Sequence, residues 1–287
     1  MFQDCYKEYS GVCVDFICLT LNAEAHLAET LDAWYGDAPV RRLLVIDGGS
    51  KDDTMKILGD YPRVSVWVYP GMTTGKAWEL LKNKVETPFF IWVDVGKIPK
   101  KGWFDEMMHQ MELDKGDILG SVRFNYKDGR LEEDPIIRNP QERLLGGPWL
   151  VWKEGVRSYH VDDDYAQRNI DIIIRRQLEE SGGNYHLVTT TSHICYLPTP
   201  VTDKEELRRR HIQCAKGIVK YITPSYAQEH ASYLLNDHWM LMMNMLDWDW
   251  IKETNPVWLP VLKEWRIRRL LIAKAARILY GFYMRLR

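Results

Sequence analysis

Residues 43–54 read Leu43-Leu-Val-Ile-Asp-Gly-Gly-Ser-Lys-Asp-Asp-Thr54, an apolar run that stops abruptly at Asp47 and continues into small turn residues. Residues 89–96, Phe89-Phe-Ile-Trp-Val-Asp-Val-Gly96, repeat this form and stop at Asp94. Short apolar runs bounded by turn residues predict buried strands. Because ligands of open α/β sheets bind beyond the carboxyl ends of the strands, we expect both carboxylates to lie on one rim.

Carboxylates on that rim repel phosphate, so they cannot cradle it directly. They can hydrogen-bond a base or ribose, or hold a divalent cation that in turn holds a diphosphate. This predicts a nucleotide-diphosphate site without a glycine-rich phosphate loop. The stretch Gly71-Met-Thr-Thr-Gly-Lys-Ala77 is not such a loop, because it has one residue too few between its glycines and an Ala where a Ser or Thr must reach Mg²⁺.

The composition is that of a folded soluble protein. Of the 287 residues, 46% are hydrophobic and 27% charged, and the net charge of −2 argues against a nucleic-acid partner. The five Cys are scattered, which argues against a structural zinc site and suggests a reducing compartment. We expect no signal peptide and no ordinary membrane span, and hence a cytoplasmic protein.

The first 125 residues alternate between strand and helix patterns. Strands are predicted at Val12–Leu19, Arg41–Ile46, Val64–Val68, Phe89–Val93 and Ile118–Phe124. Helices are predicted at Ala23–Trp34, Asp52–Leu58, Gly75–Val85 and Trp103–Leu113. This order predicts a mostly parallel α/β sheet flanked by helices.

The pattern changes after Asn125. Residues 125–150 suggest a long loop or hairpin over the rim, followed by a helix at 163–180 and short strands at 187–191 and 194–197. From Asp203 onward the chain predicts helices broken by Pro at 224, 256 and 260. We therefore expect one domain over residues 1–200 and a helical extension over 201–287.

Three segments together resemble a known family. They are Val14-Asp-Phe-Ile-Cys-Leu-Thr-Leu-Asn-Ala-Glu24, Val45-Ile-Asp-Gly-Gly-Ser-Lys-Asp-Asp-Thr54 and Trp92-Val-Asp-Val-Gly-Lys-Ile-Pro99. They resemble the nucleotide-sugar domain of family 2 glycosyltransferases, over residues 10–125 closely and 145–197 loosely. The resemblance implies a GT-A fold, which is Rossmann-like with a mixed, mostly parallel sheet flanked by helices.

The resemblance also implies a donor site and shows where this chain departs from the family. Thr20, Asn22, Asp47, Lys76, Asp94 and Lys97 are the candidate donor-binding residues, with UDP expected rather than GDP. Asp47 would bind the base or ribose, or would only cap its own turn, and Asn22 is equally a turn residue. Leu19, Leu21 and Ala23 replace family residues near the nucleobase, and Gly48 replaces an Asp.

The metal motif is incomplete. Gly96 replaces the second Asp of the family's Asp-x-Asp, which leaves Asp94 with Lys97 close behind. Mg²⁺ or Mn²⁺ would then be held by Asp94 together with His193, a position where the family often has a His. Alternatively, Lys97 neutralises part of the diphosphate as a point charge.

The family's catalytic base is an acidic residue at the start of a helix. The segment Tyr159-His-Val-Asp-Asp-Asp-Tyr-Ala-Gln-Arg-Asn-Ile-Asp171 matches that region, with Asp171 as one candidate. Asp163 and Asp164 are rivals, since adjacent carboxylates raise one another's pKa; a solvated helix start is the third interpretation. Gly146-Gly147-Pro148-Trp149 resembles the turn where an acceptor approaches, and Trp149 would stack on a sugar or lie in the core.

The last 28 residues are strongly basic. Eight bases against the single acid Glu264 give +7, which leaves −9 for the rest of the chain. The bases are Lys263, Arg266, Arg268, Arg269, Lys274, Arg277, Arg285 and Arg287. A basic amphipathic helix over 261–287 would lie on an anionic membrane surface, or would pack on its own domain or a sister subunit.

These patterns favour an inverting glycosyltransferase, peripheral on the inner face of a membrane, with a lipid-linked or surface glycan as its acceptor. Two alternatives stay open. A sugar nucleotidyltransferase would need a Gly-rich basic loop after the first strand, where residues 20–25 have none. A non-catalytic relative would bind a nucleotide sugar or a membrane without turnover.

Overall fold

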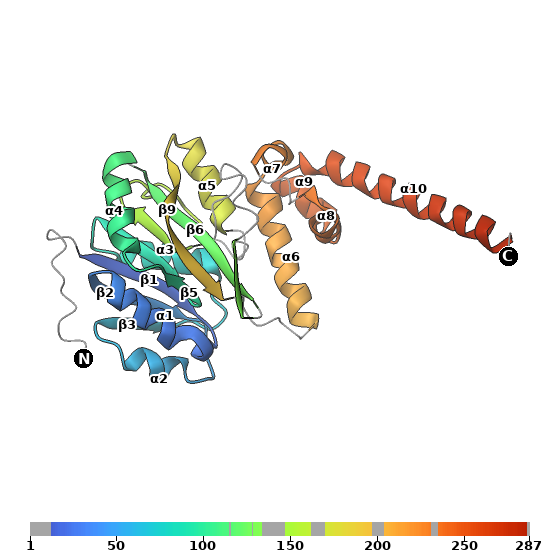
Figure 1. Ribbon diagram of the computed structural model, residues 1–287. Coiled ribbons are helices and arrows are strands. Elements are labelled where there is room, and N and C mark those ends of the chain that lie inside the picture. Colours follow the sequence, from blue (N-terminus) through green and yellow to red (C-terminus); the bar gives the residue numbers. More distant parts are fainter. Residues whose placement is uncertain are drawn as a thin grey trace. The chain divides into compact units, whose positions relative to one another are not determined.

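The computed structural model describes residues 13–114, 116–127, 129–133, 147–161, 170–196, 204–230 and 235–285. The chain divides into two compact units, residues 1–200 and 201–287 (Figure 1). The roles that the sequence suggests for these two segments stay predictions, and each unit is described by itself.

The first unit alternates strands and helices and then becomes more irregular. It begins with β1 (Val14–Thr20), α1 (Glu24–Asp37), β2 (Val40–Asp47), α2 (Thr54–Gly59), β3 (Val64–Val68), α3 (Thr74–Lys84) and β4 (Phe89–Asp94). It continues with β5 (Lys97–Pro99), α4 (Trp103–Asp114), β6 (Ile118–Lys127), β7 (Arg130–Glu133), β8 (Trp149–Trp152), α5 (Ile170–Glu180) and β9 (Tyr185–Tyr196).

The strands in the described part of this unit form one sheet. Its order is β3-β2-β1-β4-β8-β6-β9-β5, with β7 paired to β6. Strands β3, β2, β1 and β4 are parallel, as are β6 and β9. Strand β8 runs antiparallel to both β4 and β6, and β5 runs antiparallel to β9. The parallel half positions the predicted nucleotide rim.

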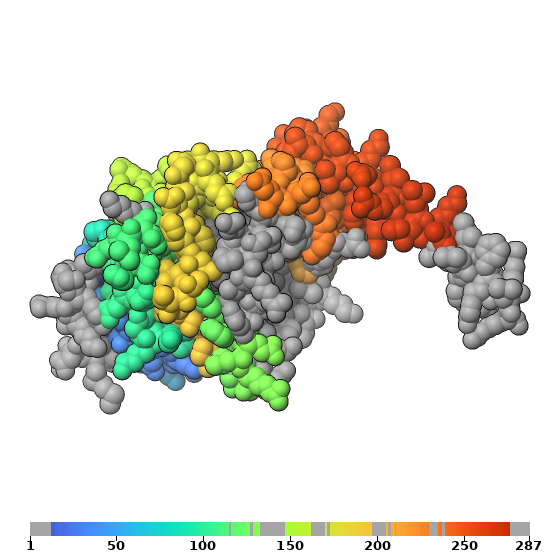
Figure 2. All heavy atoms as spheres, turned by 45° about the horizontal axis from the view of Figure 1, so that its top comes forward, coloured from blue at the N-terminus to red at the C-terminus, as the bar shows by residue number. Residues whose placement is uncertain are grey.

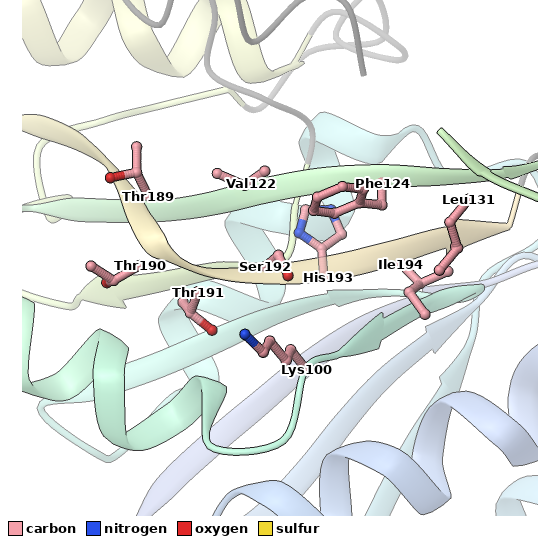
Figure 3. Close-up of a pocket in the computed structure, with 10 residues that line it drawn as sticks. All are labelled: Lys100, Val122, Phe124, Leu131, Thr189, Thr190, Thr191, Ser192, His193 and Ile194. Atoms are coloured by element: carbon pink, nitrogen blue, oxygen red, sulfur yellow. The ribbon is translucent and has the colours of Figure 1, made fainter. Parts of the chain in front are cut away.

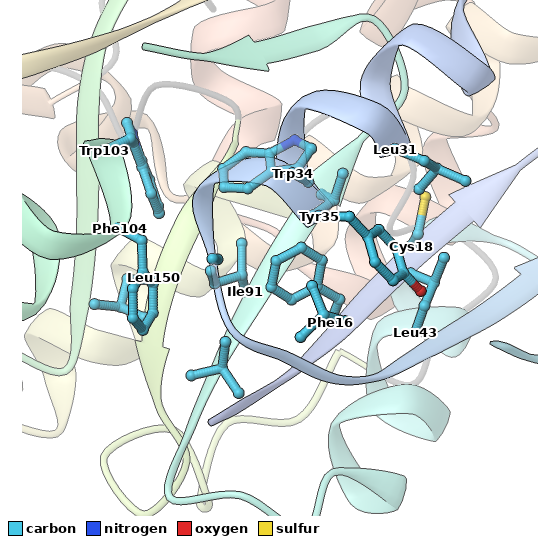
Figure 4. Close-up of a cluster of buried hydrophobic side chains, with 14 of the residues drawn as sticks. Phe16, Cys18, Leu31, Trp34, Tyr35, Leu43, Ile91, Trp103, Phe104 and Leu150 are labelled. Carbon is cyan, nitrogen blue, oxygen red and sulfur yellow. The ribbon is translucent and has the colours of Figure 1, made fainter. Parts of the chain in front are cut away.

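A strongly aromatic core holds the helices on the sheet. On one face, α1 and α4 bury Trp34 and Trp103, whose rings meet edge-on with centroids 5.0 Å apart (Figure 4). On the other face, Trp78 of α3 lies 5.0 Å from the ring of Trp92 on β4. Trp149 of β8 is 1% exposed and belongs to this second cluster, so it lies in the core and not on a surface where a sugar could stack.

The sequence prediction missed short or interrupted strands. Strand β8 lies in the middle of the sheet, although its four residues fall at the end of a segment that was predicted as a loop or hairpin. A hairpin does form at the start of that segment, between β6 and β7. The two strands predicted at 187–191 and 194–197 are one strand, β9. Its pairing with β6 skips residues 189–191, because Ser121 pairs with Val188 and Val122 with Ser192. That bulge interrupts the alternating pattern from which strands are predicted.

The sheet is forced to curl by the connection between β4 and β5. These strands are four steps apart in the sheet, roughly 19 Å on a flat sheet. Only Val95 and Gly96 connect them, and the three Cα steps from Asp94 to Lys97 span at most roughly 11 Å. The far edge of the sheet therefore returns to the end of β4, where α1 supports it through the Trp34 Nε1 bond to the Lys97 carbonyl (3.0 Å).

The second unit is helical. It contains α6 (Lys204–Tyr221), α7 (Pro224–His230), α8 (Asp237–Asn244), α9 (Trp248–Thr254) and α10 (Trp258–Arg285). Pro224 begins α7 and Pro256 separates α9 from α10. The expected break at Pro260 is wrong: Pro260 lies in the first turn of α10, where its missing N–H costs nothing.

Candidate functional site

Asp47 organises the turn at the end of β2. Its side chain is fully buried. Oδ1 accepts hydrogen bonds from the hydroxyls of Thr20 (2.9 Å) and Ser50 (2.5 Å), and Oδ2 accepts them from the backbone N–H groups of Gly49 (2.8 Å) and Ser50 (2.7 Å). Burial raises the pKa of Asp47, but these hydrogen bonds outweigh it and hold the pKa below its usual range. The structure thus shows the turn-capping role, and contact with a base or ribose stays a prediction.

The loops after β1 and β2 are joined to each other. Asn22 donates its N–H to Ser50 Oγ (2.8 Å), and its Oδ1 accepts the N–H of Lys51 (2.9 Å). Asp52 accepts the N–H of Glu24 (3.1 Å), and Glu24 in return accepts the N–H of Asp53 (2.9 Å). Asn22 is in the left-handed region at φ 49°, which its short polar side chain tolerates. The result is a rigid platform on the rim that exposes Asn22 and Glu24.

Asp94 lies on the same rim but on the opposite face of the sheet. In the register of β1, Thr20 pairs with Asp47 and Leu19 pairs with Asp94. Asp47 and Asp94 are thus in register with adjacent residues of β1. Because successive side chains of a strand alternate between faces, the two carboxylates project from opposite faces of the sheet. Asp94 Oδ1 accepts the indole N–H of Trp92 (2.7 Å), and Oδ2 lies 2.5 Å from Nζ of Lys97.

The turn after β4 places a glycine, Gly96, in a conformation that favours glycine. Gly96 has φ +83°, a conformation that a side chain strains. Its N–H donates to Thr30 Oγ1 (2.9 Å) and its carbonyl accepts the N–H of Tyr196 (2.8 Å), so both backbone groups fix the curl. An Asp here would disturb the turn that brings Lys97 back to Asp94.

The chain before β8 packs directly on Asp94. A Cβ added to Gly147 would lie 3.0 Å from Asp94 Oδ2 and 2.9 Å from a ring carbon of Trp92. Glycine therefore lets this segment approach the carboxylate closely, in the place where the family resemblance puts the acceptor.

His193 is buried and neutral. Its Nδ1 lies 2.9 Å from Ser121 Oγ, which also accepts the indole N–H of Trp103 (2.7 Å). The serine hydrogen then points to Nδ1, which assigns the proton of the imidazole to Nε2. Nε2 is buried and has no partner among the residues that the structure describes. Burial, followed by the nearby charges of Lys97 and Arg123, holds the pKa of His193 well below its usual value.

Asp94 and His193 do not form a divalent-metal site by themselves. Within the described ranges, no group of three His, Cys, Asp or Glu residues could hold a metal ion. Both oxygens of Asp94 already accept hydrogen bonds, and the charges that act on His193 are cations, which would repel a metal. A bound Mg²⁺ or Mn²⁺ stays a prediction that the described residues fit poorly.

Arg123 is a residue of this region that sequence reasoning missed. It pairs with His193 in the register of β6 and β9, and Lys97 pairs with Cys195, two residues further along β9. Residues in register share a face, so Lys97, Arg123 and His193 lie on one face of the sheet. A charge between the apolar Val122 and Phe124 within a strand was the available signal.

A pocket of about 660 Å³ opens on the other face of these strands (Figure 3). Its walls include Val122 and Phe124 of β6 and Ile194 of β9, which alternate with Arg123 and His193, together with Leu131 of β7 and Lys100. Of the predicted site residues only His193 borders it. The pocket is therefore separate from the rim that carries Asp47 and Asp94.

The other predicted site residues are placed only in part. Lys76 lies in the first turn of α3, which Thr73 caps by accepting the N–H of Lys76 (3.4 Å). The description of α5 begins at Ile170, so Asp171 is its second described residue. The side chain of Asp171 is outside the described part. Asp163 and Asp164 lie outside the described residues. The identity of the base stays a prediction.

The comparisons with known proteins show the fold. No family model and no curated protein sequence matches this chain. S. aureus TarS 1–349 in complex with UDP-GlcNAc superposes with a TM-score of 0.57 at 13% identity, covering 85% of this chain and 82% of that one. The complex of the same fragment with UDP gives 0.56 at 14% identity, covering 79% and 72%. The predicted fold class, a mixed, mostly parallel α/β sheet flanked by helices, is confirmed.

We expect Gly96→Asp, which would complete the Asp-x-Asp pattern, to lower the free energy of unfolding by about 1–2 kcal/mol, because residues with a side chain rarely adopt φ +83°. Gly96→Ala should show the same loss. The control is Gly59→Ala, since an added Cβ at Gly59 meets nothing within 4 Å. Urea denaturation measures all three, and a Gly96→Asp variant as stable as the parent protein would contradict the strained turn.

Proposed function

We propose that this chain is an inverting glycosyltransferase that transfers a sugar from a UDP-sugar to a hydroxyl acceptor. The observation that carries the proposal is that its three family-like segments meet on one rim, with Asp47 and Asp94 on either side of β1. Further support comes from the likeness in fold to a protein crystallised with UDP and with UDP-GlcNAc. A lipid-linked or surface glycan is the acceptor that we infer.

In this proposal the platform built around Asp47 receives the nucleoside. Asp47 would act through Thr20 and the turn that it holds, and the exposed Asn22 would reach the base or ribose. The anomeric carbon of the donor would then lie near Asp94 and Gly147. The acceptor hydroxyl attacks that carbon while Asp171 takes its proton, the bond to the diphosphate oxygen breaks, and UDP leaves with the bonding electron pair.

The two alternatives lack comparable support. A nucleotidyltransferase would need basic residues and glycines in the loop after β1, but that loop is closed by hydrogen bonds from Asn22 and Glu24 to the loop after β2. A binding protein without turnover would be favoured if UDP bound but no base could be found.

The first test is nucleotide binding. UDP should raise the melting temperature, because a ligand at a hundred times its dissociation constant adds roughly 2.7 kcal/mol to the free energy of unfolding. UMP and GDP serve as controls for the diphosphate and for the base. If no nucleoside diphosphate shifts the melting temperature at millimolar concentration, the nucleotide site is wrong.

The second test concerns the base. Asp171→Asn should lower turnover by about a hundredfold, the usual effect of losing a general base, and should leave UDP binding unchanged. The readouts are UDP release in the presence of acceptor and calorimetric UDP affinity. Full activity of this variant, with loss in Asp163→Asn or Asp164→Asn, would assign the base to the acidic run.

We also propose that α10 places the enzyme on an anionic membrane surface, at the cytoplasmic face. No helix in the described ranges is long and apolar enough to cross a membrane. Trp258 and Leu262 are buried at the start of α10, whereas Leu270, Leu271 and Ile272 are each more than half exposed. The described side chains of α10 are drawn in red in Figure 2. At 100° per residue, Arg266, Arg269 and Lys274 gather on one side and Leu271 and Ile272 on the other.

One basic residue interrupts the apolar side of α10, and the structure accounts for it. Arg268 pairs with Glu264, one turn earlier, at 3.0 Å. The pair is exposed and contributes little to stability, but it offsets the charge of Arg268 on that side. The positive charge of this stretch thus comes from residues that can face lipid headgroups.

Neutralising Arg266, Arg269 and Lys274 together as Gln should weaken binding to vesicles of phosphatidylcholine with phosphatidylglycerol by about a hundredfold, since each base near such a surface contributes about 1 kcal/mol. Arg268→Gln is the matched control and should have a smaller effect. Point variants are preferable to truncation after Pro260, which would remove the buried Leu262. Equal binding to neutral vesicles, or a change of oligomeric state in the triple variant, would argue for packing against protein.

A further inference from the structure

We propose that Lys97 and Arg123 hold the diphosphate of the donor as a pair of cations, taking the part that a divalent metal ion would otherwise play. The inference rests on the proposed function and assigns the chemistry of its donor site. It gives Arg123 a role that was not predicted from the sequence, and it makes nucleotide binding independent of added metal.

Lys97 lies directly against Asp94. Its Nζ lies 2.5 Å from Oδ2 of Asp94, and its side chain is 11% exposed, whereas that of Asp94 is 36% exposed. The cation therefore occupies the flank of the carboxylate where a metal ion would bind. The turn through Gly96 fixes this arrangement, because two residues are all that separate Asp94 at the end of β4 from Lys97 at the start of β5.

The two cations share one face of the sheet. Arg123 on β6 and Lys97 on β5 lie on either side of β9, and both project from the face that carries His193. Strands β6 and β5 are two sheet steps apart, roughly 10 Å. Long Lys and Arg side chains can converge from that separation on two neighbouring phosphates, Lys as a point charge and Arg as a planar fork.

His193 lies on β9, between the strands that carry the two cations. The charges of Lys97 and Arg123 both act on it and favour its neutral form. A neutral imidazole with its proton on Nε2 adds a hydrogen-bond donor but no further positive charge. A divalent ion at the same place would meet the two cations that act on His193, and no group of three His, Cys, Asp or Glu residues in the described ranges could hold it, whereas a diphosphate would meet complementary charge.

The position of Asp94 completes the arrangement. Its hydrogen bond from Trp92 and the close approach of Gly147 hold the carboxylate still. Lys97 can then bridge between Asp94 and a phosphate oxygen, so that binding of the donor does not leave the carboxylate facing an uncompensated anion. Asp94 serves as a positioning residue for Lys97 in this scheme.

The test compares uridine with UDP by calorimetry, in EDTA and in Mn²⁺. The variants are Lys97→Met and Arg123→Gln, with Lys97→Arg and Arg123→Lys as charge-preserving counterparts. The matched control is Lys100→Met, which removes an exposed lysine just after β5 that lines the pocket on the other face. Melting temperatures without ligand identify any variant that has lost its fold.

We expect UDP to bind equally well in EDTA and in Mn²⁺. Each charge-removing variant should lose about tenfold or more in UDP affinity, as the loss of one charged hydrogen bond to phosphate does, with uridine affinity unchanged. The charge-preserving variants should recover part of the loss, and Lys100→Met should behave like the parent protein.

Two results would overturn the inference while leaving the proposed function intact: UDP binding that requires Mn²⁺, or UDP affinity that is unchanged in folded Lys97→Met and Arg123→Gln variants. Failure of both uridine and UDP to bind the parent protein under any condition would instead overturn the proposed function, and this inference with it.

Discussion

The two-residue connection between β4 and β5 is the constraint on which the rim depends. It joins a strand in the middle of the sheet to a strand at its edge, so the sheet has to curl until that edge returns to Asp94. Gly96 makes the connection possible through its positive φ, and its two backbone groups bond to Thr30 and Tyr196. The incomplete metal motif and the ion pair of Asp94 with Lys97 thus have one geometric cause.

The rim has different chemistry on the two sides of β1. On the Asp47 side, both oxygens of the carboxylate accept hydrogen bonds from the protein itself. These bonds connect the end of β1 at Thr20 with the turn after β2 at Ser50. On the Asp94 side, Asp94 and Lys97 remain partly accessible. The segment at Gly147 approaches Asp94 closely because glycine has no side chain there. In the proposed sugar transfer, the hydrogen-bonded side would receive the nucleoside and the charged side would receive the diphosphate.

The sequence was sufficient where each element carries its own periodicity. Strands β1 to β4 and the helices between them were predicted within a few residues, and the family-like motifs located Asp47 and Asp94 on one rim. The sequence was insufficient where a segment becomes a strand only by pairing with a strand that is distant along the chain. The four residues of β8, the bulge in β9 and the three residues of β5 have little periodicity of their own. For the same reason Arg123 was missed, because its importance comes from His193, which lies 70 residues later in the chain.

Strand β9 has a consequence for how this protein folds. It fits between β6 and β5 and is the last strand of the sheet in the described part of the chain, with 85 residues between the end of β5 at Pro99 and its own start at Tyr185. Contacts between residues so far apart in the sequence form slowly, because closing a long loop costs conformational entropy before the hydrogen bonds between the strands can offset that cost. Strands β1 to β4 can assemble from neighbouring segments, but Lys97, Arg123 and His193 come together only when β9 is inserted. The hydrogen-bonded turn around Asp47 can therefore form early in folding, whereas the cluster of Lys97, Arg123 and His193 is completed at its end.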